Sequence, residues 1–148
     1  LYFCAKYRED NLGKEDIFIS QKINDQWSPA KLMLGINTIS SSEAPEAISV
    51  DGTQMMMFQN GQLCYSNQTY DGWSELEFLP RTVSAAKWQA DATISSNGRA
   101  LLFASARKDI VGLRKGQNLD IYVALKNDQG NWQDVINVGQ QINTPFLD

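Results

Sequence analysis

The chain has 148 residues, of which 43% are hydrophobic, 10% aromatic and 20% charged, and this composition is typical of one folded globular unit. It contains no histidine, which excludes Ser-His-Asp and Cys-His nucleophiles, histidine-bound zinc and an imidazole general base. Its net charge of -4 argues against nucleic acid as a partner, because proteins that bind the phosphate backbone are normally strongly basic.

Short strand patterns begin at the first residue. Residues 1–3, 16–19 and 31–34 are apolar runs that polar turn clusters separate from one another. Trp27 follows one of these clusters, and the run Ile36-Asn37-Thr38 comes about ten residues after it. We therefore expect three strands in this part of the chain.

The same order of anchors recurs twice, now with a further strand at the start of each set. Strands are predicted at 46–50, 55–58, 62–65 and 75–79, and again at 92–96, 101–104, 120–123 and 134–138. The dipeptides Asp51-Gly52 and Asn97-Gly98, which favour tight hairpins, lie between the first two strands of each set. The pattern predicts a four-stranded unit whose first example lacks its opening strand.

Other anchors keep their place in the predicted repeat. Phe3, Phe58 and Phe103 close the apolar runs of the second strand, while Asp16 and Asp120 open the third strand. A catalytic residue needs to occur only once, so the recurrence of the two aspartates favours a structural hydrogen bond to a neighbouring turn. A tryptophan precedes the fourth strand in each repeat, and we expect these three side chains to pack that strand on its sheet: Trp27, Trp73 and Trp132.

Four-stranded units of this size are typical of β-propellers. The sequence predicts an all-β fold of about three four-stranded antiparallel blades in one segment, 1–148, with blade repeats at roughly 1–44, 45–88 and 89–148. Each blade needs neighbours to bury its apolar faces, and closure of a ring takes more than three blades. We therefore expect the chain to be part of a longer protein, or to combine with a second copy.

The repeats resemble a known family. The runs that carry the resemblance are Leu1-Tyr2-Phe3, Asp16-Ile17-Phe18-Ile19, Trp27-Ser28-Pro29, Glu46-Ala47-Ile48-Ser49-Val50-Asp51-Gly52 and Asp120-Ile121-Tyr122-Val123. They are similar to the WD40-like repeats of TolB-type propellers. The resemblance implies a six-bladed, non-catalytic scaffold that binds envelope proteins in the periplasm or at the outer membrane of Gram-negative bacteria. The middle repeat departs from the pattern at Gln62, Ser84 and Ala85.

The loop between the second and third strands varies most in length, and variable loops on one face of a repeat protein often carry binding. Residues 6–15 and 107–118 occupy this place, and the second of these loops is basic. Such loops can be simply solvated, or they can form an electrostatic docking patch for an acidic partner. The candidate binding residues are Arg8, Trp88, Arg107, Lys108, Arg114 and Lys115.

Two other functions remain open at this point. A propeller that hydrolyses glycosides would need two carboxylates about 5–10 Å apart, and Glu46 and Asp91 are the candidates. A carbohydrate-binding propeller without turnover would use an exposed aromatic ring such as that of Trp88. We expect no cofactor, no metal and no membrane-spanning segment, since the longest apolar runs fall far short of the roughly 20 residues that a membrane helix needs. Cys4 and Cys64 are interpreted as two small buried thiols.

Overall fold

The computed structural model describes residues 1–107 and 119–146, and this part of the chain is all-β and antiparallel, without a helix. The predicted all-β class is thereby confirmed. The first sheet has the order β1-β2-β5. Its strands are β1 (Tyr2–Lys6), β2 (Glu15–Ile19) and β5 (Lys31–Leu32). A separate small hairpin of β3 (Lys22–Ile23) and β4 (Gln26–Trp27) leaves the sheet between β2 and β5.

The second sheet has five strands, and the third is a four-stranded meander. The second has the order β10-β8-β7-β6, with β9 paired to the far end of β8, and the third has the order β11-β12-β13-β14. The strands of the second sheet are β6 (Glu43–Ile48), β7 (Gln54–Gln59), β8 (Gln62–Thr69), β9 (Gly72–Trp73) and β10 (Glu77–Phe78). Those of the third are β11 (Gln89–Ile94), β12 (Ala100–Ser105), β13 (Asp120–Lys126) and β14 (Trp132–Asn137).

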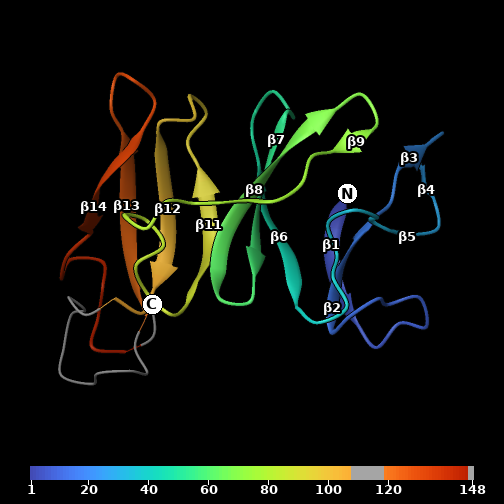
Figure 1. Cartoon of the computed structure of the whole chain (residues 1–148), viewed down its shortest axis with the longest axis horizontal. Coiled ribbons are helices and arrows are strands. Elements are labelled where there is room, and N and C mark those ends of the chain that lie inside the picture. The colour runs from blue at the N-terminus through green and yellow to red at the C-terminus, as the bar shows by residue number, and fades with distance from the viewer. Residues whose placement is uncertain (108–118, 147–148) are drawn as a thin grey trace.

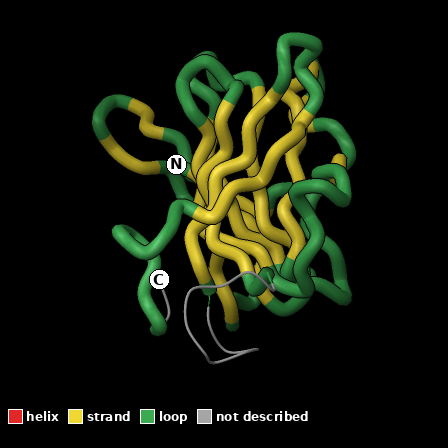
Figure 2. Tube along the Cα trace, turned by 90° about the vertical axis from the view of Figure 1, so that its left-hand side faces the viewer, coloured by secondary structure: helices red, strands yellow, loops and turns green. Residues whose placement is uncertain are grey.

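The three sheets stand side by side in chain order, as Figure 1 shows. The turned view in Figure 2 shows the strands at the centre and most loops gathered at their two ends. Two apolar layers fill the space between the sheets. The layer between the first and second sheets contains Ile17, Met33, Ile36, Met55, Met57 and Cys64. The layer between the second and third contains Met56, Leu63, Leu79, Val83, Ala92, Leu101, Phe103, Tyr122 and Ala124. The second sheet therefore buries apolar side chains on both of its faces.

The two predicted hairpins form with matching hydrogen bonds. Oδ1 of Asp51 accepts a hydrogen bond from the hydroxyl of Ser49 at 2.6 Å, and Oδ1 of Asn97 accepts one from the hydroxyl of Ser95 at 2.8 Å. The glycine that follows each has a φ of 74° or 68°, a left-handed conformation that glycine adopts without strain. The opening strands β6 and β11 begin three residues earlier than predicted and end just before these turns.

The recurring aspartates are buried and act as structural acceptors. Oδ2 of Asp16 accepts hydrogen bonds from the backbone amides of Leu12 at 2.8 Å and Gly13 at 2.9 Å, so the predicted bond to a neighbouring turn is confirmed there. Oδ2 of Asp120 accepts a hydrogen bond from Nδ2 of Asn137, at the end of β14, at 2.7 Å. This second bond lies within the third sheet, and the loop before Asp120 lies outside the described residues.

The strand pairing corrects one predicted alignment. The corresponding pairs of the second and third strands are Phe3 with Phe18, Met57 with Cys64, and Phe103 with Tyr122. Met57, and not Phe58, therefore takes the place of Phe3 and Phe103. The cause is the tight turn at Asn60-Gly61, where both residues have a positive φ. This turn fixes the register of β7 on β8 one residue away from the alignment that the phenylalanines indicate.

The two cysteines have different environments, so the interpretation of both as buried thiols is wrong. Both are free, but Cys4 is exposed and Cys64 is buried. Burial, together with the carboxylates of Glu43 and Glu46, raises the pKa of Cys64 to about 12. Cys64 therefore behaves as an apolar side chain of the layer between the first two sheets.

Candidate binding site

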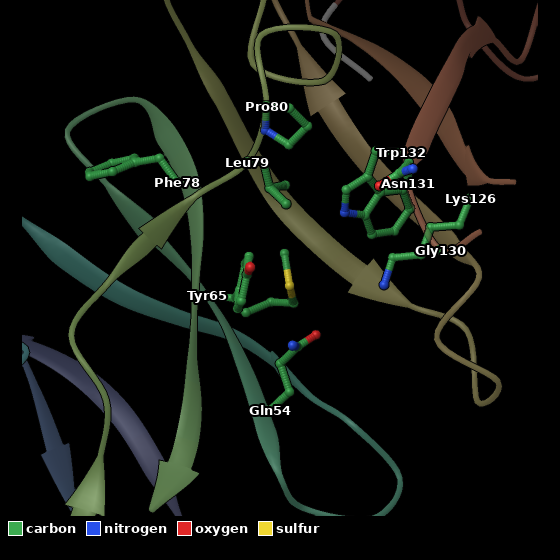
Figure 3. A pocket seen from close by; sticks show the side chains of 10 residues that line it. Gln54, Tyr65, Phe78, Leu79, Pro80, Lys126, Gly130, Asn131 and Trp132 are labelled. Atoms are coloured by element: carbon green, nitrogen blue, oxygen red, sulfur yellow. The ribbon is translucent and has the colours of Figure 1, made fainter.

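A groove of about 350 Å³ opens between the outer strands of the second and third sheets. Figure 3 shows its residues, with Trp132, Asn131 and Lys126 of the third sheet on one side and Leu79 and Pro80 of the second sheet on the other. The lining is completed by Gln54, Met56, Tyr65, Phe78 and Gly130. Phe78 lies at the outer edge, farthest from Trp132. Loops after β10 and β13 therefore build the groove on a floor that the strands provide.

Aromatic rings and amides dominate the chemistry of this groove. The ring of Trp132 is half-buried, and the ammonium group of Lys126 lies 4.6 Å from its centroid, a cation-π contact. The hydroxyl of Tyr65 donates a hydrogen bond to Oε2 of Glu77 at 2.7 Å, and this bond raises the pKa of Tyr65. Lys126 is the one charged residue among those that line the groove. The groove can therefore stack flat apolar groups and exchange hydrogen bonds.

The predicted binding residues that the structure describes, Arg8, Trp88 and Arg107, do not line this groove. Lys108, Arg114 and Lys115 lie outside the described residues. Trp88 and Arg107 come together at one end of the third sheet, where the amide of Ala106 donates a hydrogen bond to the carbonyl of Trp88 at 3.1 Å. Arg8 lies in the loop between β1 and β2, where it pairs with Asp10. Because Gln89 pairs with Ser105 and Ala100 with Leu125, the strand register places Trp88 and Arg107 at the end opposite to the groove.

Arg107 makes its contacts within the chain. Its Nη2 donates hydrogen bonds to the carbonyl oxygens of Thr82, at 2.7 Å, and Val83. Its guanidinium carbon lies 5.6 Å from the ring centroid of Tyr122 and 6.0 Å from that of Phe103. The side chain therefore joins the third sheet to the connection that follows the second sheet.

Trp88 is half-exposed and packs on the second sheet. Its ring centroid lies 5.0 Å from that of Phe58. A Cβ atom at Gly61 would come within 2.7 Å of the carbonyl oxygen of Lys87 and 3.2 Å of the Trp88 ring, so this turn requires glycine. The exposed edge of Trp88 is available to a partner, whereas its other edge fixes the start of β11.

The two carboxylates of the glycosidase alternative lie close enough to affect one another. Oε2 of Glu46 accepts a hydrogen bond from the backbone amide of Ala92 at 3.0 Å, which links the second sheet to the third. Burial raises the pKa of Glu46, and the carboxylate of Asp91 raises it further. Both residues lie at irregularities in strand pairing, and Asp91 has a φ of 54°. Bulges of this kind redirect side chains and occur often beside functional sites.

Sequence reasoning did not identify the groove. Of its residues, it identified only Trp132, and it assigned that side chain a packing role. Tyr65, Phe78 and Lys126 carry no motif, and they meet because two sheets pack together. The signal that could have found them is a set of aromatic residues in outer strands of adjacent repeats.

Comparison of the chain with protein families, curated proteins and solved structures finds no match. Within residues 1–107 and 119–146, no group of three or more Cys, Asp or Glu side chains is placed to hold a metal ion. In the same residues, no helix is long and apolar enough to cross a membrane.

Proposed function

We propose that the chain is a segment of a TolB-type β-propeller that binds another protein and catalyses no reaction. The sheets would be its blades, and a fourth strand on the inner side of β1 would complete the first of them. The family resemblance in the sequence supports an envelope partner and a location in the periplasm or at the outer membrane.

The observation that carries the proposal is the groove between the second and third sheets. Its walls present Trp132 and Tyr65, and its amides come from Gln54 and Asn131. Extended and proline-containing segments bind aromatic-lined grooves in this way, with rings stacked on prolines and side-chain donors bonded to backbone carbonyls. We infer that the groove receives an extended segment of the protein partner.

The test is a binding titration with proline-rich decapeptides, followed by the fluorescence of the protein. Saturable binding that Trp132→Ala abolishes would support the proposal. Tyr70→Ala is the matched control, because Tyr70 is a fully exposed aromatic residue in the β8–β9 turn, outside the groove. If no peptide binds, or if Trp132→Ala leaves binding unchanged, the groove is not the site. Saturable binding of soluble oligosaccharides in place of peptides would favour the carbohydrate-binding alternative.

A glycosidase is the second candidate, and the raised pKa of Glu46 beside Asp91 is the observation that favours it. This candidate predicts turnover of aryl glycosides by the purified chain. Turnover that Glu46→Gln abolishes would overturn the non-catalytic proposal. A panel of substrates that gives no hydrolysis above background would leave the scaffold as the better account.

A further inference from the structure

The contacts that hold the third sheet on the second define a junction. On the third sheet, the rings of Phe103 and Tyr122 stack with centroids 6.1 Å apart and an interplanar angle of 29°. Arg107 lies beside both rings and donates hydrogen bonds to the carbonyl groups of Thr82 and Val83. Cationic hydrogen bonds of this kind are stronger than neutral ones, so Arg107 is a strong contact between adjacent sheets.

The first sheet carries the same arrangement, and no sheet of residues 1–107 and 119–146 packs on this arrangement, although Phe18 itself is 0% exposed. Phe3 and Phe18 stack with centroids 6.0 Å apart at 26°, and the guanidinium carbon of Arg8 lies 4.5 Å from the Phe18 ring. Arg8 is about 39% exposed and forms an ion pair with Asp10 at 2.9 Å. The pair is bidentate, since Nη2 of Arg8 also donates a hydrogen bond to Oδ2 of Asp10 at 3.2 Å. Both side chains are exposed, so solvent screens the pair and other acceptors can replace Asp10.

The outward face of the third sheet matches the covered face of the second. Leu102 pairs with Val123, and Val123 pairs with Ile136, which gives an apolar row across three strands. In the second sheet, the corresponding row starts with Met56, which the third sheet covers and which is 1% exposed. Leu102 and Ile136 are 41% and 48% exposed. The third sheet therefore presents the surface on which another sheet of this kind packs.

The turn after the third sheet repeats the turn whose carbonyl groups accept hydrogen bonds from Arg107. The turn after the second sheet, in which Val83 N donates to the carbonyl of Pro80 at 2.9 Å, presents the carbonyl groups that Arg107 binds. After the third sheet, Ile142 N donates to the carbonyl of Gly139 at 3.1 Å in the same kind of turn. Val83 is fully buried, whereas Ile142 is 57% exposed. The carbonyl groups of Gln141 and Ile142 thus occupy the place of those that Arg107 binds.

The tryptophans give an independent sign of the same junction. Trp73 of the second sheet makes an edge contact with Tyr2 of the first sheet, with centroids 6.0 Å apart. Trp132 of the third sheet packs against the apolar layer that it shares with the second. Each of these rings therefore covers the preceding sheet. No sheet of the described residues precedes the first sheet, and Trp27 is 57% exposed.

We propose that two copies of this chain pair head to tail, with the first sheet of each packed on the outward face of the third sheet of the other. At each junction, Arg8 of one copy leaves Asp10 and donates hydrogen bonds to the carbonyl groups of Gln141 and Ile142 of the other. Trp27 covers the row of Leu102 and Val123. Two such junctions related by a twofold axis close a ring of six sheets, so every apolar face in it is covered.

The test begins with the mass of the purified chain in solution. Sedimentation equilibrium should give twice the 16.6 kDa of one chain, with a dissociation constant that rises about tenfold per junction in Arg8→Ala. Ile136→Glu places a charge in the apolar row and should also give monomers. Val50→Glu is the matched control, because Val50 is 80% exposed at the β6–β7 turn, away from both faces. Circular dichroism and thermal unfolding establish that each variant is folded.

A mixing experiment distinguishes the head-to-tail arrangement from other dimers. An equimolar mixture of Arg8→Ala and Ile136→Glu retains one intact junction, formed by the first sheet of the Ile136→Glu chain and the third sheet of the Arg8→Ala chain. The mixture should therefore form dimers at concentrations where each variant alone is monomeric. A monomeric wild-type chain, or a dimer that neither substitution weakens, would overturn the proposal. A dimer that loses stability in Ile136→Glu alone, with no recovery on mixing, would also overturn it, since it would indicate third sheets packed face to face.

Discussion

Replacement of Ser84 by asparagine should stabilise the middle of the chain. In the first sheet, the side-chain amide of Asn37 pairs with the backbone of Ile17, accepting from its N at 2.7 Å and donating to its O at 2.9 Å. Asn143 makes the same two bonds with Ile121, at 2.8 Å and 3.0 Å. Ser84 holds this position after the second sheet, and its hydroxyl oxygen is buried without a hydrogen-bond partner.

The geometry of the second sheet is ready for the same pair of bonds. The carbonyl of Leu63 accepts a hydrogen bond from Leu79 N at 3.2 Å, as that of Ile17 does from Met33 N at 3.0 Å. Asparagine at position 84 would place its amide opposite Leu63. Two hydrogen bonds contribute about 1 kcal/mol each, and the loss of one side chain's rotamer freedom offsets part of that gain. We expect an increase of about 1–2 kcal/mol in the free energy of unfolding, which for a chain of this length raises Tm by about 2–8 °C.

The assay is urea unfolding followed by tryptophan fluorescence, with thermal unfolding as a second measurement. Ser84→Ala is the control, because it removes the unpartnered hydroxyl without adding an amide, and it should change stability by less than about 1 kcal/mol. The reverse substitution, Asn37→Ser, should cost about 1–3 kcal/mol, since it leaves the buried Ile17 backbone groups without their partner. If Ser84→Asn lowers stability while Asn37→Ser also does, the three positions are not equivalent and the reasoning is wrong.

The hydrogen bonds from Ser49 and Thr53 hold the pKa of Asp51 at about 2, so its contribution to stability is full above pH 3.8 and is lost as the pH falls toward 2. Asp51→Asn should abolish this acid sensitivity in urea melts at pH 2–5, because Asn97 makes the same contacts without a charge; an unchanged pH profile would contradict this. The raised pKa of Glu46 means that its ionisation favours the unfolded chain as the pH rises above 4.5. Glu46→Gln should therefore be more stable than the wild type at pH 7 and equally stable below pH 4, as thermal melts would report. Cys4 should react with iodoacetamide in the native protein while Cys64 does not, and mass spectrometry of peptides from the labelled protein would show either outcome.

Local signals in the sequence predicted most of the strands. The dipeptides Asp51-Gly52 and Asn97-Gly98 fix a hairpin by their own backbone preferences, and they lie where they were expected. The aspartate at position 16 was predicted to have a structural role from its recurrence, and its contacts with a turn bear this out. These features depend on a few consecutive residues, which a sequence displays directly.

Register was harder to predict because the middle repeat offers several equivalent apolar residues. The run Met55-Met56-Met57-Phe58 has four side chains of similar hydrophobicity, and all four are buried in the structure. Alternation of buried and exposed residues normally specifies register, but a strand buried on both faces shows no alternation. The sequence alignment therefore used Phe58 as the counterpart of Phe3 and Phe103. The turn at Asn60-Gly61 sets the register of β7 on β8 so that Met57 takes this place.

The groove could not be predicted from short sequence patterns, because its residues come from two different sheets. The groove joins residues of β7, β8 and the β10 connection to the turn before β14, so it exists only when two sheets pack. The basic loop was visible as a run of charges, yet Arg107 at its start is engaged by Thr82 and Val83. At Arg107 the structure therefore shows a contact between sheets, whereas the rest of the predicted docking loop lies outside the described residues.

Equivalent residues of the three sheets mostly make the same contacts, so a residue that does not make them indicates how its surroundings differ. Residues that make the same contacts in every sheet, such as Asn37 and Asn143, report on how a sheet is built. A residue at an equivalent position that lacks the equivalent contact indicates that a packing neighbour is absent there. Trp27 is exposed where Trp73 and Trp132 are packed, and Arg8 binds a neighbouring aspartate where Arg107 binds the preceding sheet. Arg8 lies in the β1–β2 loop and Trp27 in the β3–β4 hairpin, both within the first predicted repeat. The proposed dimer accounts for the two exceptions together, because one packing partner would contact both residues.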